Sequence, residues 1–187
     1  MLRLIPSICW LVFLTYWIVS WRAVKTTTER QPRGQEILIR LTTMAGALLI
    51  GFGGARAGFD WPLVHTGILA LTILGCILCG LGLAIALWAR RTLAGNWSSN
   101  VTFKEDHELI QRGPYAYARH PIYTGILLMM LGTAITANQK GALVGVAVVF
   151  MGLWWKLRQE ETLMLKHFPG AYPAYRQRVK ALIPGVL

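Results

Sequence analysis

Residues 113–125 read GPYAYARHPIYTG, and this stretch decides how the rest of the chain is arranged. It contains a Gly-Pro turn, three tyrosines, the adjacent pair Arg119-His120, and Pro121 at the start of an apolar segment. Proline suits the first turn of a helix, because its missing N–H would have no partner there. The pattern therefore predicts a dense polar cluster immediately before a helix that enters a membrane.

The composition of the whole chain favours an integral membrane protein. Of its 187 residues, 55% are hydrophobic and 14% are charged, whereas soluble domains carry roughly 25% charged residues. The net charge of +11 is a feature shared with nucleic-acid-binding proteins. Here, however, the cationic residues lie between apolar segments, as they do in the cytoplasmic loops of membrane proteins. We therefore expect a membrane as a partner, and no nucleic acid.

Five apolar segments are predicted to cross the membrane, since each is close to the length that a hydrocarbon core of roughly 30 Å requires. They are residues 4–21, 37–54, 64–88, 121–137 and 142–155. The loops after the first and third segments, the C-terminal region and Arg40 near the start of the second segment account for sixteen of the 19 cationic residues. The other side holds Arg3, Arg56 and Lys140. Because cytoplasmic loops are enriched in lysine and arginine, the N-terminus is predicted outside and the C-terminus in the cytoplasm.

These patterns predict an all-α, multi-pass membrane protein of about five transmembrane helices with a helical C-terminal tail. We expect a single domain over residues 1–187. Residues 1–88 form a three-span scaffold, and residues 89–187 carry the cofactor-binding region with a helical hairpin.

The fourth and fifth spans are joined by only a few residues and should form an antiparallel hairpin. His120 and Tyr123, at its start, are then expected to approach Glu160 and Glu161, at its end, on the cytoplasmic face. These groups suit a nucleoside cofactor that also carries an amino acid. A carboxylate accepts two ribose hydroxyls or holds an ammonium group, and the rings of histidine and tyrosine provide hydrogen bonds or stacking.

A purely structural interpretation of the same region stays open. In it, Arg119 and Lys156 are interfacial residues, and the two glutamates form ion pairs with Arg158 or Lys166. A metal site built from two histidines and the glutamate pair has no matching helical ligand spacing, so we expect no metal. The C-x-x-C at residues 76–79 lies within an apolar run and lacks a second ligand pair, so packing is its expected role.

Two runs of the sequence resemble the isoprenylcysteine carboxyl methyltransferase family. One extends from His107 through Arg119-His120-Pro121 to Gly125, and the other from Glu160-Glu161 to residues 182–184. The likeness covers roughly residues 95–184. It implies S-adenosylmethionine as methyl donor and a five-span core that opens to the cytosol.

The resemblance also implies the residues that bind the donor. They are His107, Glu108, Leu109, Ile110, Tyr115, His120, Pro121, Ile122, Tyr123 and Glu160, to which we add the backbone N–H of Gly113 as a partner for the adenine edge. In family members a basic residue shortly before the glutamate pair contacts the acceptor carboxylate. Lys156 or Arg158 would fill this role here, and Glu161 is the candidate base if the acceptor is an amine.

The predicted function is methyl transfer from S-adenosylmethionine to a lipid or lipidated acceptor at the cytoplasmic membrane interface. The carboxylate of a prenylated cysteine, or a similar lipidic carboxylate, is the favoured acceptor. One alternative is N-methylation of a phospholipid ethanolamine headgroup, since such enzymes share the same core. Further alternatives are an NADPH-dependent sterol-type reductase and a non-enzymatic transporter or scaffold. The first three spans contain few ionisable side chains, which argues against an ion path.

Overall fold

The computed structural model describes residues 2–20, 27–30, 33–52, 62–63, 66, 68–94, 102–104 and 108–187, and all structural statements below concern these residues. The α-helices are α1 (Ile5–Ser20), α2 (Arg33–Phe52), α3 (Ile68–Leu93), α4 (Pro121–Ala137), α5 (Lys140–His167) and α6 (Ala171–Arg178). Two short 3-10 helices, η1 (Leu2–Leu4) and η4 (Gly113–Ala116), and two strands, β1 (Thr27–Arg30) and β2 (Thr102–Lys104), complete the elements.

The predicted helical architecture is confirmed, with a small addition. β1 and β2 pair as an antiparallel two-stranded ribbon, with Thr27 opposite Lys104. Both strands are short, and threonine favours extended backbone because its branched side chain fits a pleated surface. The ribbon joins the connection after α1 to the connection after α3, so these two connections lie at the same end of the molecule.

Three of the described helical segments are long and apolar enough to cross a membrane, namely Leu2–Ser20, Ile68–Leu93 and Lys140–His167. Two shorter apolar helices, Ile37–Gly51 and Pro121–Ala137, correspond to the second and fourth predicted spans. α4 has the predicted bounds, and α5 continues past the fifth predicted span to His167.

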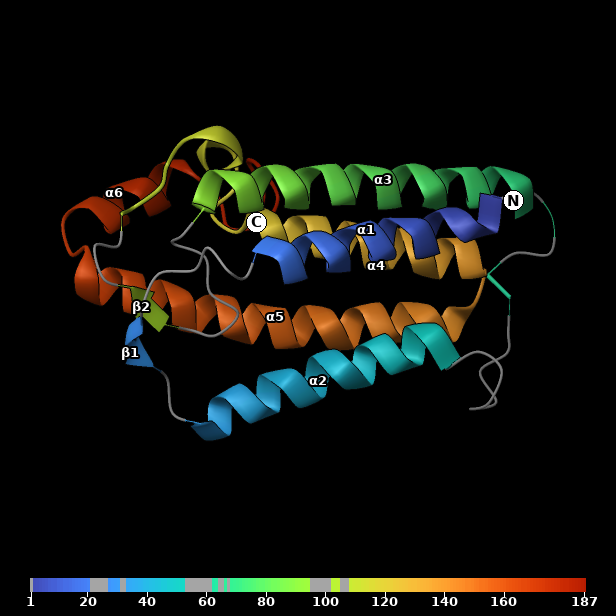
Figure 1. Ribbon diagram of the computed structural model, residues 1–187, viewed down its shortest axis with the longest axis horizontal. Coiled ribbons are helices and arrows are strands. Elements are labelled where there is room, and N and C mark those ends of the chain that lie inside the picture. The colour runs from blue at the N-terminus through green and yellow to red at the C-terminus, as the bar shows by residue number, and fades with distance from the viewer. Residues whose placement is uncertain are drawn as a thin grey trace.

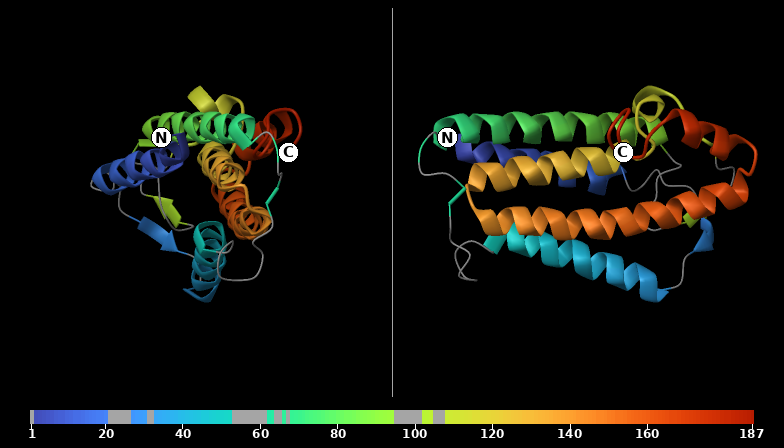
Figure 2. Two further views of the ribbon diagram at one scale, coloured as in Figure 1. Left: turned by 90° about the vertical axis from the view of Figure 1, so that its right-hand side faces the viewer. Right: turned by 180° about the vertical axis from the view of Figure 1, so that it is seen from behind.

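The helices lie side by side with similar axis directions (Figure 1). α3 packs against α1 and α4, α4 packs against α5, and α5 packs against α2. Two further views show α4 between α3 and α5, with α2 on the outer side of α5 (Figure 2). The helix that begins directly after the polar stretch is therefore central in the bundle.

Glycines bring α3 and α4 into backbone contact. A Cβ atom built on Gly82 would lie 2.5 Å from the carbonyl oxygen of Gly125, and one on Gly132 would lie 2.4 Å from the carbonyl oxygen of Gly75. α2 and α5 meet in the same way, since a Cβ on Gly46 would lie 2.7 Å from the oxygen of Gly145. Small residues at such positions favour helix association in lipid, where packing replaces the hydrophobic effect. Gly125 is thus a point where α4 approaches α3 closely.

The two ends of the bundle differ in what they carry. At one end, α4 stops at Asn138, whose φ of 54° is left-handed, and Pro62 forms a bridge with Gln139. At the other end lie η4, α6, the ribbon and the last turns of α5 (Figure 1). The polar stretch at residues 113–125 and the glutamate pair thus share one end, as the hairpin predicted.

Candidate functional site

The imidazole of His120 lies between the two neighbouring carboxylates of α5. His120 precedes the first residue of α4, and its side chain is 11% exposed. Its Nδ1 is 3.5 Å from Oε2 of Glu160, and its Nε2 is 3.4 Å from Oε1 of Glu161. The Nε2 atom is buried and has no aligned hydrogen bond among the described residues. The expected approach of His120 to the glutamate pair is therefore confirmed.

Tyr123 and Lys156 complete the surroundings of Glu160. The hydroxyl of Tyr123 donates a hydrogen bond of 2.6 Å to Oε1 of Glu160, and its ring stacks parallel to that of His120 with 5.5 Å between centroids. Nζ of Lys156 lies 4.0 Å from the same carboxylate oxygen and 5.5 Å from the centre of the Tyr123 ring. Arg158 is exposed on a different face of α5, because two residues along a helix point in nearly opposite directions. Of the two basic residues considered for contact with the acceptor, Lys156 is the one that lies beside the glutamate pair.

Glu161 is enclosed by arginines. Nε of Arg119 donates to Oε1 of Glu161 over 2.8 Å, and one of its terminal nitrogens donates to the same oxygen over 2.5 Å. Nε of Arg176, on α6, lies 3.5 Å from the other carboxylate oxygen. Sequence reasoning assigned Arg119 only an interfacial position. Two signals in the sequence could have indicated its contact with Glu161, namely its positive charge and its position next to His120, because the hairpin that brings His120 to the glutamate pair brings Arg119 there too.

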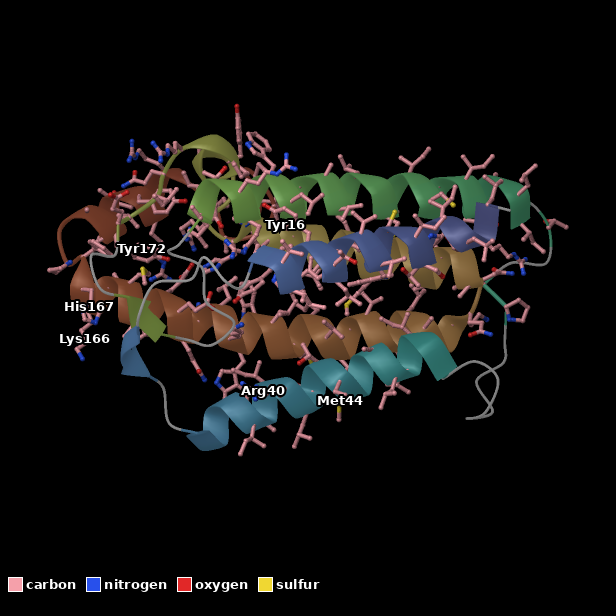
Figure 3. All side chains as sticks on the ribbon, viewed as in Figure 1. Tyr16, Arg40, Met44, Lys166, His167 and Tyr172 are labelled. Atoms are coloured by element: carbon pink, nitrogen blue, oxygen red, sulfur yellow. The ribbon has the colours of Figure 1, made fainter. Side chains whose placement is uncertain are left out.

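The C-terminal segment lies along the beginning of α4. The backbone N–H groups of Arg119 and His120 donate to the carbonyls of Lys180 and Ala181, each over 2.9 Å. The hydroxyl of Tyr175 donates over 2.6 Å to the backbone oxygen of Tyr115. Tyr172, Lys166 and His167 lie at this end of the molecule, whereas Arg40 and Met44 lie along α2 (Figure 3). The polar cluster is thus built from three separate parts of the chain.

Electrostatics at this end favour a positively charged His120. Burial by itself lowers the pKa of His120, but hydrogen bonding and charge from Glu160 and Glu161 outweigh it and raise that pKa above the usual value. Burial raises the pKa of Tyr175 to about 12. Burial and the charge of Glu160 also raise the pKa of Tyr115, so this phenol stays neutral.

The remaining predicted donor residues occupy several environments. Glu108 is exposed, Leu109 and Ile110 are half-buried, and Tyr115, Pro121 and Ile122 are buried. Gly113 has a left-handed φ of 61°, and a Cβ there would lie 3.0 Å from the hydroxyl of Thr92, so glycine is required at this turn. His107 lies outside the described residues. Within the described ranges, no three histidine, cysteine, aspartate or glutamate side chains are grouped to hold a metal ion.

Comparison with known families adds a separate line of support. A family model described as "Phospholipid methyltransferase" matches residues 70–171, more than half of the chain. The match includes most of α3, all of α4 and α5, and with them His120, Glu160 and Glu161, whereas Arg176 lies beyond it.

Curated proteins named as isoprenylcysteine O-methyltransferases are similar in sequence to the chain. The chain is 32% identical over 120 residues to protein-S-isoprenylcysteine O-methyltransferase of Saccharomyces cerevisiae, which covers 60% of this chain and 48% of the relative. It is 33% identical over 84 residues to the Schizosaccharomyces pombe enzyme of that name, covering 43% and 34%. The chain thus spans half or less of the length of these relatives. The resemblance to isoprenylcysteine methyltransferases is confirmed.

One solved structure has a similar fold. It is described as the eukaryotic intramembrane Ras methyltransferase ICMT, an isoprenylcysteine carboxyl methyltransferase, and it matches with a TM-score of 0.58 and 24% identity. The match covers 83% of this chain and 54% of that chain. At this level of identity the similarity concerns the fold.

Proposed function

The chain belongs to the phospholipid methyltransferase family, and from this we propose that it transfers a methyl group from S-adenosylmethionine to a lipid-like carboxylate. The observation that carries this proposal is the buried imidazole of His120 between Glu160 and Glu161, with Lys156 at its edge. In this proposal five helices cross the membrane, and the polar end faces the cytoplasm with most of the cationic residues. The donor then arrives from the cytosol, and the acceptor arrives from the lipid.

The residues present fit the donor. Its amino acid part carries an ammonium group, and Glu160, with 23% of its side chain exposed, is the accessible carboxylate of the cluster. Nε2 of His120 is a buried polar atom that lacks an aligned hydrogen bond, which is a place for a ligand oxygen or nitrogen. We assign the ammonium or ribose to Glu160, and the purine to the backbone near Leu109, Ile110 and Gly113. When bound, the donor supplies an electrophilic methyl group.

Lys156 is assigned to the acceptor. Its ammonium is a compact charge on a flexible stem, and it orients an anion without the two-point grip of an arginine. The carboxylate loses its negative charge as it attacks the methyl group, so its attraction to Lys156 is stronger before the reaction than in the transition state. Tight binding by Lys156 would therefore raise the activation barrier for methyl transfer, and weak binding avoids this. A carboxylate is already a nucleophile, so the chain need supply no base for this reaction. A site from which water is excluded favours a reaction in which opposite charges become neutral.

N-methylation of a phospholipid amine is the second candidate, because the matching family is described as phospholipid methyltransferases. An amine must lose a proton, and Glu161 is the candidate base. Its carboxylate is held by Arg119 and Arg176, which stabilise the charged form and make it a weaker base. The pairing of Glu161 therefore favours the carboxylate acceptor.

Calorimetric binding of S-adenosylhomocysteine to the detergent-purified protein tests the donor site. We expect an affinity on the order of micromolar. His120→Ala and Glu160→Gln should each weaken it by at least about tenfold, because losing a hydrogen bond to a charged group costs about 1.5–3 kcal/mol. Glu108→Gln, at an exposed position, shows whether the site extends that far. Absence of binding to the folded, unaltered protein would contradict the proposal.

The acceptor is tested by methyl transfer from labelled donor. An N-acetylated S-prenylcysteine should accept the label, and vesicles that contain phosphatidylethanolamine should not. Lys156→Ala should raise KM for the carboxylate acceptor with little change in donor affinity, whereas Arg158→Ala should leave both unchanged. Transfer to the phospholipid amine alone would support the second candidate instead.

A further inference from the structure

Arg119 makes more polar contacts than any step proposed above requires. Its side chain is 8% exposed. Besides its two bonds to Glu161, its remaining terminal nitrogen donates to the carbonyl of Arg176 over 3.3 Å and to the carbonyl of Val179. One guanidinium thus joins the carboxylate of α5 to the last backbone carbonyls of α6. Cations are favoured at such a helix end, where the carbonyls lack intrahelical partners.

Backbone hydrogen bonds continue this connection in both directions. We call residues 176–182 the C-terminal clasp. Ala118 and Lys180 form a parallel bridge, and the N–H of His120 donates to the carbonyl of Ala181. One turn later, the hydroxyl of Thr124 donates to the carbonyl of Leu182 over 2.8 Å. The clasp therefore follows the chain from the residue before Arg119 into the first turn of α4.

The clasp acts on His120 from two sides. Its backbone is held directly by the carbonyl of Ala181, and its Nε2 faces the Glu161 oxygen that Arg119 holds. We propose that Arg119 is a positioning residue, which uses the clasp and Glu161 to fix His120 in the orientation that the donor requires. The proposal rests on the proposed donor site, and it assigns a function to a residue that does not itself contact Glu160 or Lys156.

The chemistry of the contacts requires arginine at position 119. A guanidinium presents several N–H groups in one plane and is able to bond a carboxylate and two carbonyls at once. A lysine ammonium keeps the positive charge but lacks this planar set of donors. Arg119→Lys therefore tests whether the hydrogen-bond geometry, and not the charge alone, is needed at this position. Arg112, in the same loop but exposed, provides the matched control as Arg112→Lys.

The experiment measures three properties of each variant in detergent: melting temperature, affinity for S-adenosylhomocysteine, and the pH titration of the His120 ring by NMR with labelled histidine. The chain has 4 histidines, and the spectrum of His120→Gln identifies the relevant signal. Arg119→Lys should weaken binding by about tenfold, the lower end of what is lost when partners that orient ligands are removed at metal sites. It should also lower the titration midpoint of His120, whereas Arg112→Lys changes neither.

A double variant separates positioning from stability. Arg119→Gln leaves Glu161 buried with fewer partners and should lower the melting temperature, and Arg119→Gln/Glu161→Gln should recover much of that loss. If Arg119 positions His120, the double variant still binds weakly. Its titration does not enter this comparison, because Glu161→Gln itself removes one of the two carboxylates that raise the pKa of His120. Recovery of binding together with melting temperature would show a purely structural role and overturn the proposal. So would unchanged binding and titration in Arg119→Lys.

Failure of the proposed function has a different signature. In that case the unaltered protein binds no S-adenosylhomocysteine, yet the titration of His120 in Arg119→Lys and Arg112→Lys still shows whether Arg119 controls the imidazole.

Discussion

The apolar body of the bundle and its polar end are held together by different interactions. Between α3 and α4, glycines let the backbones touch, as at Gly82 and Gly125. At the polar end, charged side chains from α5 and from the residues before α4 form a connected cluster around His120. The body depends on volume and the end depends on charge, so a change that damages one should leave the other nearly unaffected.

The difference follows from the environments of the two regions. Within a bilayer the surrounding lipid tails are as apolar as the side chains, so no hydrophobic effect drives helices together. They associate through close packing instead. Buried charges are costly unless each has partners, which explains why Glu161 is met by both Arg119 and Arg176. Ionisable groups gather where α4 begins and α5 ends, whereas the buried residues of the body are mostly small or apolar, such as Cys79, Met129 and Val149.

The largest effect on stability is expected from Gly82→Ala. The new Cβ would lie 2.5 Å from the Gly125 carbonyl oxygen, and a backbone atom has little freedom to move away. We expect a loss of about 2–3 kcal/mol, at the upper end of typical overpacking costs. Gly80→Ala, on an open face of the same helix, is the control and should be neutral or slightly stabilising. Equal thermal stability of the two variants in detergent would contradict the backbone contact.

The next effect concerns pH and should arise only at the polar end. His120 faces Glu160 and Glu161 of α5 and Tyr123 of its own helix, and its pKa is raised. A raised pKa contributes stability that is complete below the ordinary value near 6.5 and is lost as pH rises through the folded-state value. The melting temperature should therefore fall as pH rises above about 6.5, the ordinary pKa of histidine.

His120→Gln is the control for this pH dependence. It removes the titrating ring, so the melting temperature of this variant should change little as pH rises above the ordinary pKa of histidine. Gly82→Ala should lower the whole curve without changing its shape. A variant without His120 that retained the full slope would assign the pH dependence to another group.

The smallest effect is expected from Trp10→Phe in the body. Nε1 of Trp10 donates a hydrogen bond of 3.0 Å to the hydroxyl of Thr133 on α4, and the substitution keeps an aromatic ring beside Phe13. Hydrogen bonds between helices in membranes contribute about 0.6 kcal/mol on average. Chemical or thermal unfolding in detergent should detect a loss of about that size. A loss of several kcal/mol would show that polar contacts, and not packing alone, hold the body together.

Hydrophobic periodicity and loop length were sufficient to predict the helices and the position of the polar end. The hairpin of α4 and α5, and with it the approach of His120 to Glu160 and Glu161, followed from a connection of only a few residues. Helical spacing left Lys156 and Arg158 undecided, since Lys156 lies four residues before Glu160 and Arg158 lies three residues before Glu161. The structure decides between them, because it places Lys156 beside Glu160. The hairpin contacts were predictable because they depend on local geometry that the sequence states directly.

The partners of Arg119 were not predictable in the same way. Two of them are backbone carbonyls, those of Arg176 and Val179, which every residue type provides and no pattern marks. The ribbon of β1 and β2 was missed for a related reason, since short strands pair across a long stretch of sequence without a turn between them. Interactions set by the path of the backbone appear only once the fold is known.

The clasp also imposes an order in time. Ribosomes make a chain from its N-terminus, so α4, Arg119 and Glu161 exist before residues 176–182 do. The membrane helices are therefore able to insert and pack while the imidazole of His120 still lacks its backbone partner at Ala181. A chain that has been synthesised only as far as α5 then has a packed bundle but lacks an ordered site. The site becomes ordered only when residues 176–182 lie along the beginning of α4.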